Sequence, residues 1–521
     1  MAPKILLTSP LWHANEDTKE WNHFPSNQPV DWDSLSTRPG QWTLIRQLGD
    51  DIQIAADRTR SHPIAYAFAG GNWVVTDDVN KLRSFVPWEL DEEPARVFRD
   101  SAFTLENRTL IRGVYSTEAA TITTLHADGR VSSEPYMRYR LVGDGTEITT
   151  DAEYDEAFSN AMDAALTRLL DAAGNRQLVL PLSGGLDSRL LAAWLKRLDA
   201  PNVAAFTYGK AGSREVEVSR QVAENLGIKW QSVETPVQQV RSAWRSSEAA
   251  DFVQATWKGT SLPHVQDWYA LRTLRAGGLL EEDAIILPGH TIVGNMHHEH
   301  LADGPVDRAK IVQAMISHHL TLNRNHPKSA SSSHFVHAVQ SAFAQTDFPN
   351  TPRATQTAIE WFNLRERQAK YINNSMAGYE FFGYSWALPM LDPEFWEVWQ
   401  LGSPRLTVTR DWYARFTEQI FSEQAGTSPK LFTARSLMKP SALKSSLLTV
   451  MRATRADKAL SRYRSTKTML DHPMSFEAYT RKPRKTQAVK HLLGTTQMGL
   501  WTGEFLDNSW TTDREIVPTG K

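Results

Sequence analysis

The sequence contains no cysteine among its 521 residues. This absence excludes disulfide bonds, thiolate metal ligands and a cysteine nucleophile. The two signs of charge nearly cancel to a net charge of -2, so the chain lacks the basic field that attracts nucleic acid or an anionic membrane. Its apolar runs are far shorter than the ~18 residues that span a bilayer, and its start does not resemble a signal peptide. We therefore expect a cytoplasmic protein with no membrane span and no nucleic-acid partner.

The patterns of strand and helix divide the sequence near residues 145–155. Its hydrophobic content of 41% and charged content of 22% are typical of a globular protein. Residues 1–148 show short alternating apolar runs and turn signals, including an Asp-Gly hairpin signal at Asp128 and Gly129. Residues 149–521 alternate helices with strands and become mostly helical after about residue 305. We predict a β-rich α+β domain, followed by an α/β domain with a doubly wound parallel sheet and a helical C-terminal part.

The segment LVLPLSGGLDSRLLAAWLKRL, residues 178–198, runs from an apolar strand through two glycines into an amphipathic helix. We expect the glycines to let the backbone turn sharply and approach a ligand closely. The helix would direct free N–H groups to that point, and Ser183 and Ser188 add hydroxyl donors, which suits a phosphate-type anion. Asp187 suits such an anion only if a divalent cation lies between the two. The pattern predicts a cradle for magnesium and pyrophosphate; a helix cap beside an incidental Gly-Gly turn is the alternative.

Ser-Gly-Gly-Leu-Asp-Ser between a strand and a helix resembles the signature of the ATP pyrophosphatases, specifically of the asparagine synthetase-like branch. Members of this branch split ATP between the α and β phosphates, adenylate a carboxylate, and let an amine attack the acyl-adenylate. The segment AFTYGKAGSREVEVSRQVAENLGIKW is similar to their second strand and helix, whose strand end borders the adenine. The resemblance implies ATP and Mg²⁺ as cofactors, with Asp187 as metal ligand and catalytic residue. It assigns nucleotide-binding roles to Leu182, Ser183, Gly184, Gly185, Asp187, Ser188, Phe206, Thr207, Tyr208, Gly289 and His290.

The first part of the chain is similar to the glutaminase domain of the same family. Its segment DRTRSHPIAYAF has Asp57, Arg58, Pro63 and Tyr66 in the matching places. That domain attacks glutamine through an N-terminal cysteine, which this chain does not have. The resemblance therefore implies a glutaminase-like domain without glutaminase activity. Ammonia would then come from elsewhere, and we expect a separate ammonia-supplying protein as a partner; a homodimer is a further expectation.

Three later blocks are similar to a sub-branch found in bacterial surface-polysaccharide gene sets: residues 262–268, 287–291 and 366–399. In that sub-branch the implied activity is amidation of a sugar carboxylate. Within the third block, Glu380 and Asp392 fill a family pattern that belongs to the helical subdomain closing the acceptor pocket. The resemblance therefore implies a catalytic role for Glu380.

The sequence departs from the family pattern after Thr291. Family members carry an aspartate there that helps to hold magnesium on the pyrophosphate, whereas Ile292 and Val293 follow in this chain. Magnesium prefers oxygen ligands and keeps several waters, so Asp187 with phosphate oxygens could suffice, or Glu299 could contribute.

A positive side chain is expected near the reaction centre, because the tetrahedral intermediate and the departing pyrophosphate carry negative charge. The family supplies a lysine from a late segment, whose counterpart here is FTARSLMKPSALKSS. We favour Lys439 over Lys444 as the catalytic residue, against the alternative that both are ordinary solvated lysines. Arg189 is a further candidate.

The run MHHEH, residues 296–300, raises the question of a metal site. It lacks the His-Glu-x-x-His spacing that places two histidines on one face of a helix. His297, His298 and His300 cannot all face one point on a regular element, so we interpret the run as a polar loop, with a metal site as the alternative.

Together these features predict an ATP-dependent, AMP-forming carbon–nitrogen ligase that acts on a small-molecule, sugar or peptide carboxylate. One alternative is an intramolecular amide-forming cyclase of the lasso-peptide or β-lactam type, which shares this architecture and also lacks the cysteine. Another is a non-catalytic homologue that binds nucleotide without turnover, because both the cysteine and the second magnesium carboxylate are missing.

Overall fold

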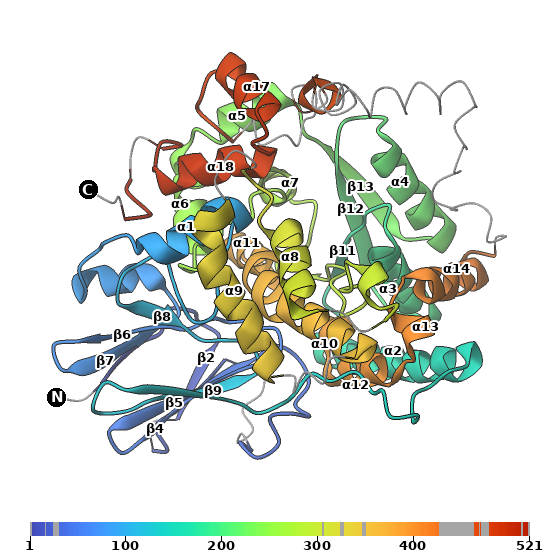
Figure 1. Ribbon diagram of the computed structural model, residues 1–521. Coiled ribbons are helices and arrows are strands. Elements are labelled where there is room, and N and C mark those ends of the chain that lie inside the picture. Colours follow the sequence, from blue (N-terminus) through green and yellow to red (C-terminus); the bar gives the residue numbers. More distant parts are fainter. Residues whose placement is uncertain are drawn as a thin grey trace.

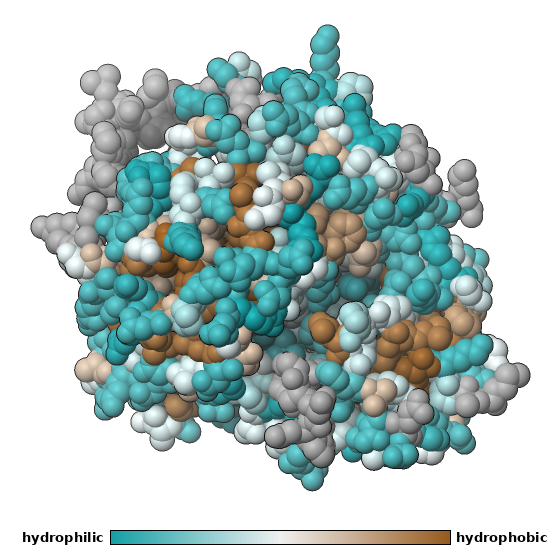
Figure 2. Space-filling view, turned by 180° about the vertical axis from the view of Figure 1, so that it is seen from behind, coloured by the Kyte–Doolittle hydropathy of each residue, from teal (hydrophilic) through white to brown (hydrophobic). Residues whose placement is uncertain are grey.

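The computed structural model describes residues 3–15, 17–23, 31–304, 307–323, 328–345, 351–426, 463–467, 469, 479–511 and 514–518. The N-terminal sheets lie at the lower left of Figure 1, a parallel sheet lies at the right, and the helices α8 to α11 lie between them in this view. Seen from behind, most of the surface is hydrophilic, and hydrophobic side chains gather in separate areas (Figure 2). Within the described ranges, no helix combines the length and the apolar character that crossing a bilayer demands.

The second part of the chain is built on a five-stranded sheet in the order β13-β12-β11-β14-β15, and every neighbouring pair is parallel. This confirms the predicted parallel sheet; its doubly wound arrangement stays a prediction. The strands are β11 Leu178–Pro181, β12 Val203–Gly209, β13 Lys229–Glu234, β14 Ile285–Ile286 and β15 Ser385–Trp386. The helices of its first half are α2 Asp151–Ala173, α3 Leu186–Arg197, α4 Arg214–Leu226, α5 Val237–Ala243, α6 Ser247–Thr256 and α7 Trp268–Ala276. As predicted, the strand of the 178–198 segment is followed directly by the helix α3.

The first part of the chain contains two sheets. A four-stranded sheet has the order β1-β7-β6-β8, and a six-stranded antiparallel sheet has the order β10-β9-β5-β4-β3-β2. The predicted hairpin at Asp128 is confirmed, because β9 and β10 pair around it and Gly129 adopts φ +87°. The elements are β1 Lys4–Leu6, β2 Trp12–Asn15, β3 Glu20–His23, β4 Thr43–Leu48, β5 Asp51–Ala56, β6 Ala65–Ala69, β7 Asn72–Thr76, η1 Val79–Ser84, α1 Glu92–Ser101, β8 Val114–Ser116, β9 Thr121–Leu125 and β10 Val131–Pro135.

After residue 305 the described chain is almost entirely helical, as predicted. The helical elements from residue 299 onward are η2 Glu299–Leu301, α8 Arg308–His319, α9 Lys328–Gln345, α10 Pro352–Phe362, the π-helix η3 Asn363–Ile372, η4 Asn373–Ser375, α11 Met376–Phe381, η5 Pro389–Leu391, α12 Pro393–Leu401, α13 Pro404–Thr407, α14 Asp411–Ala425, α17 Arg484–Leu492 and α18 Gln497–Leu506. The π-helix continues α10 and carries several buried charged side chains toward the N-terminal part. π-Helices are rare and are frequent at functional sites.

The two parts of the chain share one hydrophobic core and several buried ion pairs. A single cluster of buried apolar side chains extends from Ala65 to Val517. The guanidinium of Arg365 on η3 pairs with Glu118 of the N-terminal part, and both side chains are buried. Burial raises the pKa of Asp392 to about 6, although an ion pair with Arg168 opposes the shift. Asp392, expected near the acceptor, also accepts the amide of Gly40 at 3.0 Å, so the structure places it in the joint between the two parts.

We predict that Arg365→Met destabilises the whole chain by about 3–5 kcal/mol, because removal of one partner leaves the Glu118 charge buried and unpaired. The free energy of unfolding in urea measures the effect. Arg405→Met is the matched control, since Arg405 pairs with Asp151 on the surface and such pairs contribute at most about 1 kcal/mol. Equal losses in the two variants would contradict the importance of the buried pair.

Candidate functional site

The loop between β11 and α3 is held by hydrogen bonds among its own serines. The hydroxyl of Ser188 accepts the amide N–H of Ser183 at 3.2 Å and lies 3.1 Å from the Ser183 hydroxyl. The Ser183 hydroxyl in turn accepts the amide of Gly185 at 3.1 Å. Gly184 and Gly185 do not adopt positive φ, and the expected close approach of a ligand to their backbone stays a prediction. A Cβ on Gly185 would lie 3.1 Å from the Ser183 hydroxyl oxygen and crowd it.

Asp187 lies in the first turn of α3, where the unpaired amides of a helix begin. Its carboxylate pairs with the guanidinium of Arg410, which immediately precedes α14, and Tyr413 lies nearby. Burial raises the pKa of Asp187, while Arg410 and Tyr413 oppose that shift. Asp187, which the sequence analysis names as the metal ligand, is therefore already paired with the positive charge of Arg410.

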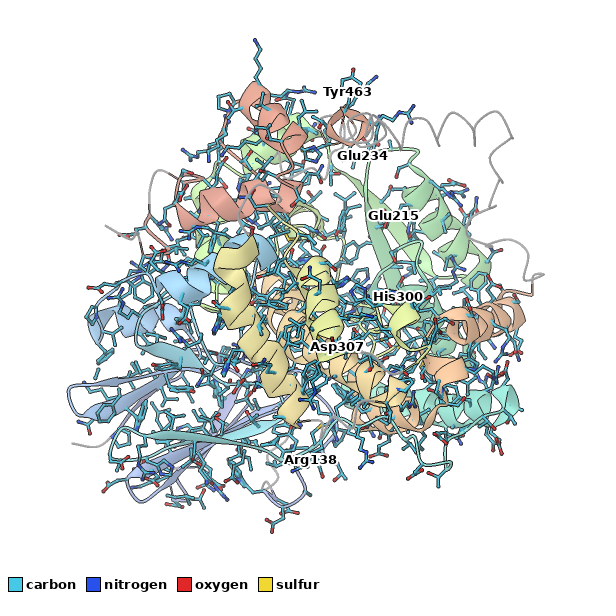
Figure 3. The ribbon with its side chains drawn as sticks, in the orientation of Figure 1. Arg138, Glu215, Glu234, His300, Asp307 and Tyr463 are labelled. Atoms are coloured by element: carbon cyan, nitrogen blue, oxygen red, sulfur yellow. The ribbon has the colours of Figure 1, made fainter. Side chains whose placement is uncertain are left out.

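The end of β12 meets the same edge of the sheet. Phe206 is fully buried, and the Thr207 hydroxyl donates to the carbonyl of Leu182 at 2.7 Å, so both side chains serve to join the strands. The Tyr208 hydroxyl donates to Asp267, which also accepts the hydroxyl of Tyr379 on α11 at 3.0 Å. In Figure 3 Glu234, at the end of β13, and Glu215, in the first turn of α4, lie toward the same upper end of the sheet.

The loop after β14 closes onto the start of α3. A Cβ on Gly289 would lie 2.6 Å from the amide nitrogen of Ser188, so the two backbones approach as closely as glycine allows. The next residue, His290, shares a side-chain hydrogen bond with Asn373. Burial and the neighbouring His264 lower the pKa of His290 to about 4, so its imidazole is neutral at pH 7. Neutral imidazole carries one nitrogen able to accept a proton.

Glu380 lies in a different place from the loop that carries Asp187. It accepts the indole N–H of Trp386 at 2.9 Å and lies 3.8 Å from His62 of the N-terminal part. With these residues it lines a cavity of about 50 Å³ between the two parts of the chain, beside Lys258 and Asn374. Among the described residues, no contact joins Glu380 to Asp187, so its catalytic role stays a prediction.

Several other sequence-based expectations have clear structural outcomes. Lys439 and Lys444 lie outside the described residues. Arg189 is buried and donates to the carbonyl of Gly184 at 3.2 Å, so it supports the loop. No described contact brings Glu299 to Asp187.

The histidine loop forms ring contacts with the end of α8. His297 stacks on His318 at 4.1 Å, and His298 lies 5.9 Å from His300 and 5.6 Å from His318. In Figure 3 His300 lies on η2, beside α8. Over the ranges that the structure covers, no group of three or more His, Asp or Glu side chains could hold a metal ion. The interpretation of the run as a polar loop stays a prediction.

Comparison with known proteins supports the resemblance for one segment. Residues 158–257 match the family model described as asparagine synthase, a range that contains the Ser-Gly-Gly-Leu-Asp-Ser loop and the strands β11 to β13. No curated protein matches the chain. Among solved structures, an NH3-dependent NAD synthetase from Campylobacter jejuni subsp. jejuni NCTC 11168, in complex with the nitrate ion, is similar at 17% identity and a TM-score of 0.19. The alignment covers 26% of this chain and 57% of that protein, and a TM-score this low does not establish a shared fold.

Sequence reasoning missed two residues that the structure brings to this edge of the sheet, Arg410 and Asp267. Arg410 is 223 positions from its partner Asp187, and no local pattern marks it. Asp267 lies in the 262–268 block that drew attention as a whole, and its two phenol donors come from β12 and α11. Asp267 is the only acidic residue of that block and directly precedes Trp268, which is a signal that could have found it, whereas nothing in the sequence pairs Arg410 with α3.

We predict that Gly289→Ala separates the β14 loop from α3, because the added methyl would overlap the Ser188 amide. Overpacking of this kind costs about 1–3 kcal/mol of stability. Nucleotide affinity should fall by at least about tenfold, which is about 1.4 kcal/mol, as measured by isothermal titration calorimetry. Gly304→Ala is the matched control, since a Cβ there meets nothing within 4 Å. Unchanged nucleotide affinity in Gly289→Ala would contradict a role for this close approach in binding.

We also predict that acid weakens the joint between the two parts through His23 and His62, whose rings stack at 3.7 Å. Burial lowers the pKa of each ring to about 3; His62 adds to the shift at His23, and Lys258 adds to the shift at His62. Unfolded histidine binds a proton below about pH 6.5 whereas the folded rings do not, so stability is complete above that pH and is lost as pH falls toward about 3. The urea midpoint, followed from pH 8 to pH 5, should fall less steeply in His62→Gln than in the unchanged protein. The midpoints at pH 8, where neither state is protonated, correct for the intrinsic cost of the substitution, and parallel curves would contradict the prediction.

Proposed function

We propose that this chain is an ATP-dependent ligase that forms an amide by activating a carboxylate as an acyl-adenylate. The observation that supports the proposal most strongly is the loop at the carboxyl end of β11, where the first turn of α3, the Asp187 carboxylate and the Gly289 backbone converge. Open parallel sheets bind ligands at this edge, and helix N-termini bind phosphates. The asparagine synthase match covers the same segment.

The residues present fit a nucleotide with one magnesium ion. The first-turn amides of α3 and the glycines provide close backbone access for phosphate oxygens, and a side chain at position 289 would block that access. Asp187 provides one carboxylate, which fits a cation held mainly by phosphate oxygens and water. A magnesium ion there would neutralise charge on the departing pyrophosphate.

In the proposed reaction a substrate carboxylate oxygen attacks the α-phosphorus, the bond to the β-phosphate oxygen breaks, and pyrophosphate leaves. An amine nitrogen then bonds to the acyl carbon, AMP departs with the electrons of the carbon–oxygen bond, and the amine loses a proton. That proton passes to solvent or to the departing AMP, because His290, whose pKa is lowered to about 4 by burial, is too weak a base to hold it at pH 7. The neighbouring Gly289 holds His290 beside the start of α3.

The identity of the acceptor and amine is the finer part of the proposal. We propose a sugar, peptide or other small carboxylate as acceptor, with ammonia from a separate protein, since the N-terminal part has no cysteine to release it from glutamine. The polysaccharide branch and a homodimer belong to the same proposal. The engagement of Asp187 by Arg410 favours one competing function, a non-catalytic nucleotide-binding homologue, because a carboxylate already paired is less available to a metal.

We predict that Asp187→Asn lowers ATP–pyrophosphate exchange by at least about 100-fold, since charge stabilisation of the leaving group is worth roughly 10²–10³ in rate. The assay follows the return of labelled pyrophosphate into ATP with candidate uronic acids, aspartate and short peptides. Asp171→Asn, an exposed change on α2, is the control. Full exchange in Asp187→Asn would contradict the mechanism. Nucleotide binding without exchange for every acceptor would instead support the non-catalytic function.

A further inference from the structure

Arg410 is held beside Asp187 by further contacts, with Gly294 and Tyr413. Its side chain crosses Gly294 so closely that a Cβ there would lie 2.7 Å from Cδ of Arg410, and Gly294 adopts φ +82°. Its guanidinium lies 5.2 Å from the ring centre of the buried Tyr413. The β14 loop and the start of α14 therefore contact the aliphatic part of the Arg410 side chain, and the position of its guanidinium does not depend on Asp187 alone.

The guanidinium is also open to a ligand. The Arg410 side chain is 42% exposed and that of Asp187 is 28% exposed, so the pair lies at the surface of the loop rather than in the core. A guanidinium has five N–H donors in a planar fork that matches phosphate oxygens, and the pair with Asp187 engages one of its terminal nitrogens. The helix α14 that follows Arg410 packs on α3 through Phe416 and Trp194, which fixes the arginine relative to the phosphate-binding turn.

We propose that Arg410 is an exchangeable counter-ion for the leaving pyrophosphate. In the ligand-free protein it neutralises Asp187, and in the complex its fork turns to the phosphate oxygens and releases Asp187 to the divalent cation. The inference rests on the proposed function, because it names the residue that would bind the pyrophosphate released at the same loop. A specific consequence is positive coupling between the cation and pyrophosphate. Pyrophosphate draws Arg410 away from Asp187 and frees the carboxylate for the cation, and the cation in turn frees Arg410 for pyrophosphate.

The test measures binding rather than turnover. Manganese(II) binding to the ligand-free protein is followed by electron paramagnetic resonance, and pyrophosphate binding at fixed magnesium by calorimetry. In the unchanged protein, pyrophosphate should raise manganese affinity at least about tenfold. In Arg410→Gln, manganese affinity without pyrophosphate should rise about tenfold, because a positive charge next to the carboxylate is removed, whereas pyrophosphate affinity should fall at least about tenfold. Arg410→Lys keeps the charge without the fork and should restore pyrophosphate binding only in part.

Arg415→Gln is the matched control, because Arg415 lies on the same helix and pairs with Asp151 and Asp155 instead. It should leave both affinities unchanged. If Arg410→Gln changes neither affinity, or lowers both, the counter-ion proposal is wrong while the proposed function stands. If the unchanged protein binds neither pyrophosphate nor ATP, the proposed function itself is wrong.

Discussion

The contact between the backbone at Gly289 and the amide of Ser188 is the constraint on which the candidate site depends. It joins the end of β14 to the first turn of α3, two segments that are separated by about a hundred residues in the chain. Because there is no room for a side chain between them, this contact holds the loop that carries His290 and Gly294 against the start of α3. The same loop contacts Arg410 through Gly294, so one close approach bears on where the positive partner of Asp187 lies.

The N-terminal part supports this arrangement through packing and hydrogen bonds. Asn373 donates to the carbonyl of Thr59 at 3.0 Å and also hydrogen-bonds His290, so an N-terminal loop supports a residue of the site. The shared core and the buried Arg365–Glu118 pair hold the two parts together. The N-terminal part therefore helps to position Asn373 and the π-helix η3, which lie next to the candidate site.

Local patterns in the sequence were sufficient to predict several helices, strands and turns, but they did not predict which side chains pair across the fold. The apolar run ending at Leu182, the glycines and the amphipathic helix predicted the loop, and Asp128-Gly129 predicted a hairpin, because each signal lies within a few residues. The Asp187–Arg410 pair and the position of Glu380 in the cavity with His62 depend on long-range packing, which no spacing encodes. No signal in the sequence indicated that a Cβ on Gly185 would crowd the Ser183 hydroxyl at 3.1 Å, because that contact depends on the conformation of the loop.

The charges around the turn favour anion binding before any metal is considered. The first turn of α3 carries a partial positive charge of about half a unit, Arg410 adds a full one, and Asp187 cancels a full one. The balance is slightly positive, so a free carboxylate or phosphate is attracted, while a divalent cation alone gains little. In the proposed complex a nucleotide with its cation would change this balance, because its phosphates would engage Arg410 and leave Asp187 to the metal. The pairing of Asp187 with Arg410 therefore disfavours binding of a metal ion alone. It is compatible with a metal ion that binds together with phosphate groups, because those groups would compete for Arg410.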